Sequence, residues 1–140
     1  MAPPKEIVPP FLNFAPLENA VASLERTAQA YDQALAHASE NGASALARAQ
    51  LREANSKLIA VERALTSNQG LPNRPWYKHE VYAPGFYTGY GVKTLPGVRE
   101  SIEQKDWKLA EDEIAHVGKT LENAGEAIQG AAAELQRAAK

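Results

Sequence analysis

The chain has 140 residues, a formal net charge of −2, a sequence isoelectric point near 5.9 and no cysteine. The charge excludes a broad electrostatic attraction to nucleic acid, and the lack of cysteine excludes disulfides, thiolate metal sites and a cysteine nucleophile. No apolar run is long enough to span a membrane, so we expect one domain that contacts neither nucleic acid nor a membrane.

The N-terminal part of the sequence changes character near residue 17. Residues 1–16 hold five of the nine prolines, which favours an extended arm that Phe11, Leu12 and Phe14 could dock on the domain. Beyond this arm, apolar residues recur at alternating spacings of four and three, and this pattern predicts a helix over about residues 17–40. Its expected inward stripe consists of Leu17, Val21, Leu24, Ala28, Tyr31, Leu35 and Ala38.

A turn and a second helix are expected next. Asn41-Gly42 tolerates the left-handed backbone at which many helices end, and Ser44 can accept a hydrogen bond from the free amides that open another helix. The apolar spacing then predicts a helix over about residues 45–66, antiparallel to the first. Its expected stripe consists of Ala47, Leu51, Ala54, Leu58, Val61 and Leu65.

Residues 67–95 differ from the rest of the chain. They hold six of the ten aromatic residues, and their frequent glycines and prolines prevent a helix or a central strand from running through them. Because the aromatic content argues against disorder, we predict a long ordered loop. Long ordered loops are commonly functional, so we expect any function of the chain to reside here.

The residues leave two interpretations of this loop open. In the first, Arg74, Lys78 and His79 interleave with tyrosines and recognise a carboxylate or the end of a peptide. In the second, the charged groups lie on the surface and the aromatic side chains pin the loop to the helices. The aromatic side chains with this role would be Trp76, Tyr77, Tyr82 and Phe86.

Two more helices complete the predicted fold. Pro96 favours the start of a short helix over about residues 96–103, and Asp106 can cap a final helix over about residues 107–138. The fold class is therefore all-α: an antiparallel bundle of three long helices and one short helix. The final helix contains three glycines, which we attribute to the close approach of a neighbouring helix. These are Gly118, Gly125 and Gly130, and the stripe beside them is Ala110, Ile114, Val117, Leu121, Ala124, Ile128, Ala131 and Leu135.

The sequence predicts no catalytic site and no metal site in this chain. Its three histidines, His37, His79 and His116, do not form a paired metal-binding motif. The acidic run Glu111-Asp-Glu113 falls in the first turns of the final helix, where carboxylates interact favourably with the helix dipole. We therefore assign that run a structural role rather than acid–base chemistry.

One motif in the loop resembles a known family. The run Gly70-Leu-Pro-Asn-Arg-Pro-Trp-Tyr-Lys-His-Glu-Val-Tyr-Ala-Pro84, followed by Tyr90-Gly91 and Leu95-Pro-Gly97, is similar to the C-terminal dimerisation domain of the transferrin receptor and glutamate carboxypeptidase II family. The order of parts also agrees, with a helical hairpin, the loop, a short helix that begins at Pro-Gly and a long final helix. The resemblance covers nearly the whole chain, and the loop motif is its most specific part.

This resemblance implies that residues 17–140 are a non-catalytic dimerisation domain of a glutamate carboxypeptidase II-like zinc exopeptidase. The implied partners are a second copy of the chain, the peptidase and apical domains of the parent protein, and its peptide substrate. Zinc is the implied cofactor, with its ligands in the peptidase domain. The compartment stays open, and the residues alone also allow an independent helical adaptor that binds a peptide or a partner protein through the aromatic loop.

The resemblance also assigns roles within the loop. Tyr90 matches the family tyrosine that contacts the carboxylate of the substrate's C-terminal residue. Gly89 replaces the lysine that precedes this tyrosine in glutamate carboxypeptidase II, so the resemblance does not extend to a preference for glutamate. We expect the remaining residues of interest to form a framework that holds the loop. This framework is Arg74, Trp76, Tyr77, His79 and Tyr82.

Overall fold

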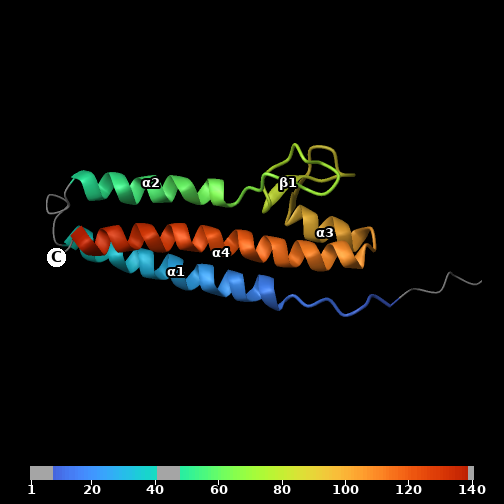
Figure 1. Cartoon of the computed structure of the whole chain (residues 1–140), viewed down its shortest axis with the longest axis horizontal. Coiled ribbons are helices and arrows are strands. Elements are labelled where there is room, and N and C mark those ends of the chain that lie inside the picture. The colour runs from blue at the N-terminus through green and yellow to red at the C-terminus, as the bar shows by residue number, and fades with distance from the viewer. Residues whose placement is uncertain (1–7, 41–47, 139–140) are drawn as a thin grey trace, which may run out of the picture.

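The computed structural model describes residues 8–40 and 48–138, and within them it confirms a mostly helical bundle (Figure 1). The expected turn at Asn41-Gly42 and the cap at Ser44 lie outside the described residues. No helix of the described part has the length and apolar character needed to cross a membrane. The elements are α1 (Ala15–Glu40), α2 (Arg48–Ala64), β1 (Tyr82–Pro84), β2 (Val92–Thr94), α3 (Pro96–Glu103) and α4 (Trp107–Ala138).

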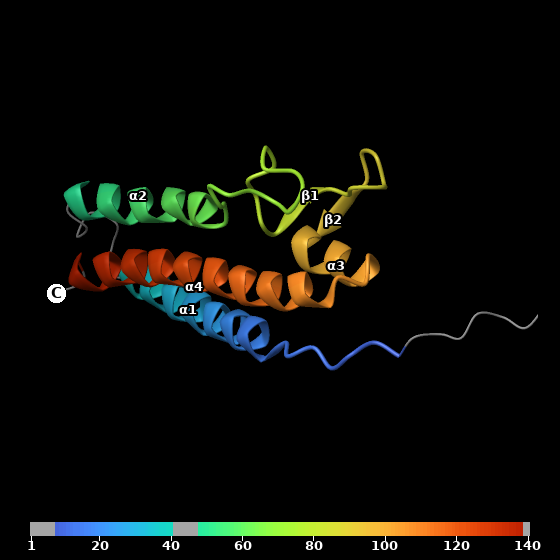
Figure 2. The same cartoon turned by 45° about the vertical axis from the view of Figure 1, so that its right-hand side comes forward.

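The final helix α4 is the centre of the bundle. Both α1 and α2 pack along α4, and the two views place α4 between them (Figures 1 and 2). The chain directions of α1 and α2 are antiparallel, as predicted, but their main contacts are with α4 rather than with each other. Asp106 caps α4, because its carboxylate accepts a hydrogen bond from the amide of Leu109 at 3.1 Å. Pro96 opens α3, also as predicted.

The core follows the predicted stripe of α4. Ile114 and Val117 are fully buried in a cluster that also contains Leu17, Val98 and Leu121. Every other member of the stripe is buried except Ile128, which is half-buried. Leu12 and Phe14 dock against this cluster, whereas Phe11 is 87% exposed and does not. A second cluster joins α1, α2 and α4, and it contains Ala34, Ala54, Ala132 and Leu135.

The predicted stripe of α1 is wrong at two positions. Val21 and Leu35 are each 42% exposed, while their neighbours Ala20 and Ala34 are buried. The inward face is rotated by one residue at these turns, because the small alanine side chains let α1 approach α4 more closely than valine or leucine would. As a result, α1 carries two large apolar side chains on its outer flank.

One of the three glycines of α4 explains this close approach. A Cβ atom at Gly118 would lie 3.1 Å from the backbone oxygen of Pro16, which is tighter than most such contacts. Gly118 therefore lets the start of α1 rest against α4, as predicted. Gly125 is different, since a Cβ there would meet α1 at an ordinary 3.8 Å. At Gly130 the nearest group is the flexible side chain of Lys57.

Candidate functional site

The loop is ordered by backbone hydrogen bonds to the end of α2. The amide of Glu80 donates to the carbonyl oxygen of Leu65 at 2.9 Å, and the amide of Ser67 donates to that of Lys78 at 2.8 Å. Between these bonds the chain makes a compact turn in which Leu71 is almost fully buried. Gly70, in the left-handed conformation (φ +69°), lets this turn start.

The second half of the loop forms an antiparallel hairpin. β1 pairs with β2, with Tyr82 opposite Thr94 and Pro84 opposite Val92. These strands differ from the irregular loop predicted for residues 67–95, because three-residue strands are too short to show a recognisable alternation. Residues 85–91 form the tip of this hairpin and project away from the helices (Figure 2).

Arg74 lies at the base of this hairpin and is 5% exposed. Its guanidinium donates to Glu100 Oε2 on α3 at 2.5 Å and also to the carbonyl oxygen of Pro84. The rings of Tyr77 and Phe86 each have their centroid 5.3 Å from the guanidinium carbon, within the range of a cation–π contact. Because Glu100 neutralises Arg74, this arginine is not an open cation for a substrate carboxylate.

His79 belongs to a second small network at the end of α2. Its Nδ1 atom accepts hydrogen bonds from the amides of Val81 and Tyr82, and its Nε2 atom lies 3.3 Å from a carboxylate oxygen of Glu62. The Tyr82 ring packs on the imidazole at 3.8 Å between centroids, and its hydroxyl donates to Glu62. This hydrogen bond, together with the charge of Glu62, raises the pKa of the Tyr82 phenol.

Of the expected framework residues, Trp76 stands apart. Its side chain is 68% exposed, and its indole ring lies 6.3 Å from the ring of Tyr77. The other four, Arg74, Tyr77, His79 and Tyr82, make contacts that join segments of the loop to one another, to α2 or to α3. Lys78, the remaining cation of the first interpretation, donates to the carbonyl oxygen of Asn68 at 2.5 Å.

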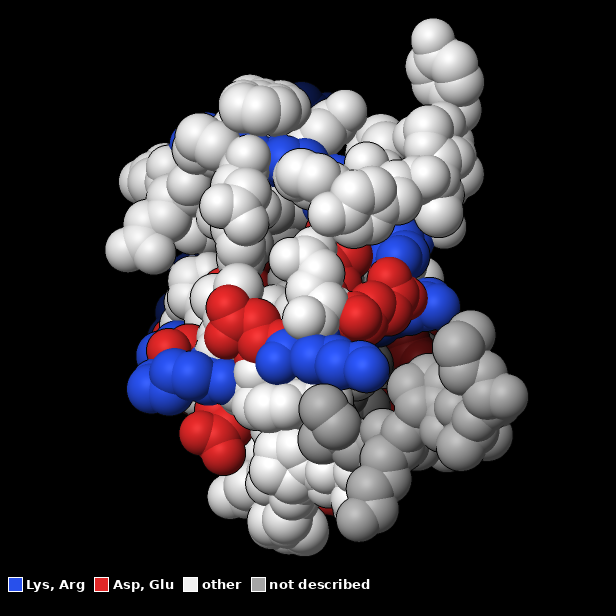
Figure 3. Space-filling view, turned by 90° about the vertical axis from the view of Figure 1, so that its right-hand side faces the viewer, with Lys and Arg blue, Asp and Glu red and all other residues white. Residues whose placement is uncertain are grey.

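Tyr90 lies on the hairpin tip and is fully exposed. Hydrogen bonds close the tip around it, from the amide of Gly85 to the oxygen of Gly91 and from the amide of Gly91 to the oxygen of Thr88. Seen from this end of the molecule, the part of the surface above the central band of charges is largely uncharged (Figure 3). The tip therefore presents an aromatic side chain to any surface that covers this end.

Two carboxyl groups meet beneath the loop without full hydrogen bonding. Glu80 is completely buried, and the imidazole Nε2 atom of His116 lies 3.5 Å from its Oε1 atom. Within residues 8–40 and 48–138, neither carboxylate oxygen of Glu80 has a hydrogen-bond partner, nor does Oε2 of Glu113. Burial, and then the charge of Glu80, raises the pKa of Glu113, so this carboxyl holds its proton to a higher pH than an exposed glutamate. Among the described residues, no three or more histidine, aspartate or glutamate side chains are grouped so that they could hold a metal ion.

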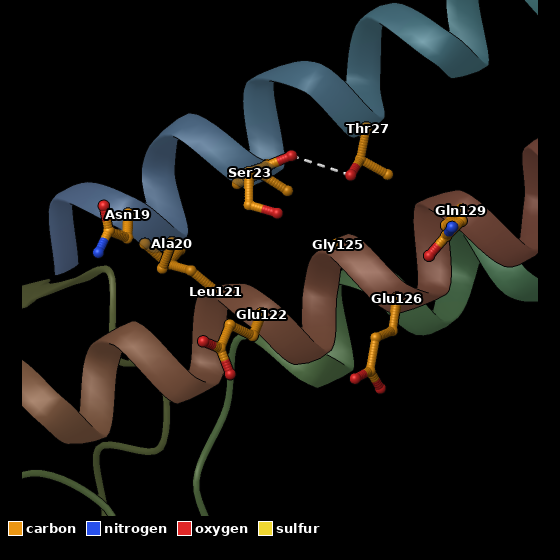
Figure 4. A pocket seen from close by; sticks show the side chains of 10 residues that line it. Asn19, Ala20, Ser23, Thr27, Leu121, Glu122, Gly125, Glu126 and Gln129 are labelled. Carbon is orange, nitrogen blue, oxygen red and sulfur yellow. Dashed lines mark hydrogen bonds between the residues drawn. The ribbon is translucent and has the colours of Figure 1, made fainter. Parts of the chain in front are cut away.

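A groove runs along the bundle between α1 and α4 (Figure 4). Its floor is formed at Gly125, and its α1 wall carries the hydroxyl groups of Ser23 and Thr27. The Thr27 hydroxyl donates to the backbone oxygen of Ser23 at 2.9 Å, so that hydroxyl is already used within α1. The groove is open and shallow, and we assign no chemistry to it.

A sequence model described as the transferrin receptor-like dimerisation domain matches residues 12–129. The chain is 36% identical over 88 residues to the probable glutamate carboxypeptidase LAMP1 of Arabidopsis thaliana, which covers 58% of this chain and 13% of that protein. It is 28% identical over 126 residues to the aminopeptidase NAALADL1 of Rattus norvegicus, which covers 89% of this chain and 16% of that protein.

A relative without activity is also similar. The chain is 28% identical over 80 residues to the inactive zinc metalloprotease C354.09c of Schizosaccharomyces pombe, which covers 57% of this chain and 10% of that protein. The chain thus spans less than one fifth of the length of each of these three relatives.

Proposed function

This chain belongs to the transferrin receptor-like dimerisation domain family, and from that premise we propose that it pairs two copies of a glutamate carboxypeptidase II-like zinc exopeptidase. The observation that carries the proposal is the family match, which extends from the N-terminal arm through most of α4. The domain itself is proposed to be non-catalytic. The zinc ligands are assigned to a peptidase domain of the parent protein, in keeping with a relative that is named an inactive zinc metalloprotease.

The outer flank of α1 supports self-association. Val21 and Leu35 lie 14 residues apart, which is close to four helical turns, so both side chains are on one side of α1. A second subunit that covers both side chains would remove apolar surface from water, which favours association. A two-fold dimer would use this face twice, once from each copy, because a two-fold contact joins the same surface of both subunits.

Sedimentation of the 140-residue chain tests the dimer. We expect the Val21→Gln/Leu35→Gln double variant to weaken self-association by roughly a hundred- to a few thousandfold. Each apolar side chain contributes about 1.5–3 kcal/mol when it becomes fully buried, each of these is still 42% exposed, and the two-fold dimer loses four of them. Ile59→Gln, which changes an exposed residue of α2, is the matched control and should leave the dissociation constant unchanged. A chain that stays monomeric at high micromolar concentration would count against dimerisation by this domain.

We propose further that the hairpin tip reaches the substrate pocket of the parent enzyme. Tyr90 is fully exposed, while buried groups hold the base of the tip. The position of the Tyr90 side chain is therefore constrained relative to the bundle. A phenol hydroxyl can donate a hydrogen bond to the carboxylate at the C-terminus of a peptide substrate. In this arrangement Tyr90 binds substrate and takes no part in the chemical step.

Kinetics of the full-length parent test the role of Tyr90. We expect Tyr90→Phe to raise KM about ten- to a hundredfold with little change in kcat, because a hydrogen bond to a charged group contributes about 1.5–3 kcal/mol. Tyr87→Phe is the matched control, since Tyr87 lies on the same tip and is 75% exposed. Equal kinetics for the Tyr90 variant and the unchanged enzyme would remove the substrate role and favour an adaptor that binds partners through the loop.

A further inference from the structure

Glu100 contacts both halves of the loop from within the bundle, and its partners in the second half lie at the start of the tip. Its Oε2 atom accepts a hydrogen bond from Arg74 at 2.5 Å, and its Oε1 atom accepts one from the amide of Phe86 at 2.6 Å. Arg74 in turn donates to the carbonyl oxygen of Pro84. We call these four groups, Arg74, Glu100, the Pro84 carbonyl and the Phe86 amide, the tip clamp.

The tip clamp joins the hairpin to a rigid part of the fold. Glu100 lies on the inner face of α3, where Pro96, Gly97 and Val98 are also buried. The Ser101 hydroxyl donates to the carbonyl oxygen of Gly97 at 2.6 Å, and α3 packs against α4. Glu100 therefore holds its carboxylate at a fixed place relative to the central helix.

The two backbone groups of the tip clamp lie at the start of the tip. Pro84 is the last residue of β1, and Phe86 is the second residue of the tip, four positions before Tyr90. Both are held by charged groups that are at least nine-tenths buried, which makes these hydrogen bonds stronger than those of an exposed turn. The direction in which the tip leaves the hairpin is thus set at its first residues.

We propose that Glu100 is a positioning residue for the tip, residues 85–91, and that it determines the orientation in which Tyr90 is presented. The consequence for substrate binding rests on the proposed function, whereas the consequence for the order of the tip does not. Glu100 acts through the Phe86 amide and through Arg74, and its own carboxylate stays buried.

Amide hydrogen exchange of the 140-residue chain tests the order of the tip. In the Glu100→Gln variant we expect the protection of the Phe86 amide to fall at least tenfold and that of the Gly91 amide to fall with it, while the amides of α4 keep their protection. The Phe86 amide resonance should also move upfield, because it loses a charged acceptor. Glu122→Gln, which changes an exposed carboxylate on α4 paired with Lys119, is the control and should alter neither signal.

A second variant covers the case in which Glu100→Gln does not fold. In Arg74→Met/Glu100→Leu both charges are replaced together by apolar side chains of similar size, a change that buried ion pairs often tolerate. A folded double variant with an exchanging tip would support the proposal. A folded variant of either kind whose Phe86 amide keeps its protection within twofold would overturn it, and so would unfolding of both variants, because Glu100 would then serve the fold as a whole.

Kinetics of variants of the parent enzyme distinguish the role of Glu100 in positioning the tip from the proposed role of Tyr90 in binding substrate. If both hold, Glu100→Gln raises KM at least about tenfold with little change in kcat, and its effect is less than additive with that of Tyr90→Phe, because both act on one contact. If Tyr90→Phe leaves KM unchanged, the substrate role fails, and hydrogen exchange at Phe86 still decides whether Glu100 positions the tip.

Discussion

The Arg74→Met variant is expected to have a free energy of unfolding about 3–5 kcal/mol below that of the unchanged chain, because it leaves the carboxylate of Glu100 buried without its cationic partner. Arg74 and Glu100 are 5% and 6% exposed, so water cannot replace the lost interaction. The variant also removes the donor to the Pro84 carbonyl. Urea unfolding followed by circular dichroism measures the difference from the shift in the midpoint at an unchanged slope.

A matched control separates burial from charge. Lys119→Met removes a lysine that pairs with Glu122 at 3.1 Å on the surface of α4, and the two side chains are 63% and 51% exposed. Exposed pairs contribute little, so we expect this variant to stay within about 0.5 kcal/mol of the unchanged chain. If Arg74→Met and Lys119→Met destabilise the chain equally, the Arg74–Glu100 pair does not hold the loop to α3.

The Gly70→Ala variant is expected to have a free energy of unfolding about 2–5 kcal/mol below that of the unchanged chain. Two costs add at this position. Gly70 has a φ of +69°, a conformation that costs an ordinary residue about 1–2 kcal/mol. The new Cβ would also clash with the carbonyl oxygen of Pro75 and would lie 2.7 Å from its carbonyl carbon, and relief of such overpacking costs about 1–3 kcal/mol.

Gly89→Ala isolates the first of these costs. Gly89 has a similar φ of +60°, but a Cβ there would have no neighbour within 4 Å in the described part of the chain. We therefore expect this variant to lose only about 1–2 kcal/mol, and thermal or urea unfolding of the two variants measures the contribution of the clash. A Gly70→Ala variant as stable as Gly89→Ala would show that the turn after α2 adapts, so the Gly-Leu-Pro segment would not depend on close packing at Pro75.

The sequence predicted correctly those features that depend on neighbours along the chain. The stripe of α4 is largely buried, as expected, because apolar residues that recur every three or four positions lie on one face of a helix. Pro96 and Asp106 mark the starts of α3 and α4, since their effect on a helix end is local. The loop motif was sufficient to identify the family, and the family match confirms that identification.

The site was only partly predictable. The five framework residues were expected to act together, and all make contacts in the loop, although Trp76 is largely exposed. The other four are Arg74, Tyr77, His79 and Tyr82. Their role in function stays a prediction. The partners of two of them, Glu100 for Arg74 and Glu62 for His79, were not anticipated, because both carboxylates lie on helices whose charged residues would ordinarily face water. The spacing carries a weak signal for Glu100. It lies three and four residues after Gly97 and Pro96, so the three residues share one face of α3.

Sequence by itself determined where the helices run, which face of α4 enters the core, and that the aromatic loop is the distinctive part of the chain. Tertiary structure alone decided that α4 lies between α1 and α2, that Val21 and Leu35 remain on the outer flank, and that Glu100 reaches the hairpin. The physical reason is the separation along the chain of the groups that interact. Helix propensity, caps and periodicity act over a few residues, whereas the closeness of two helices and the pairing of buried charges depend on groups far apart in the chain.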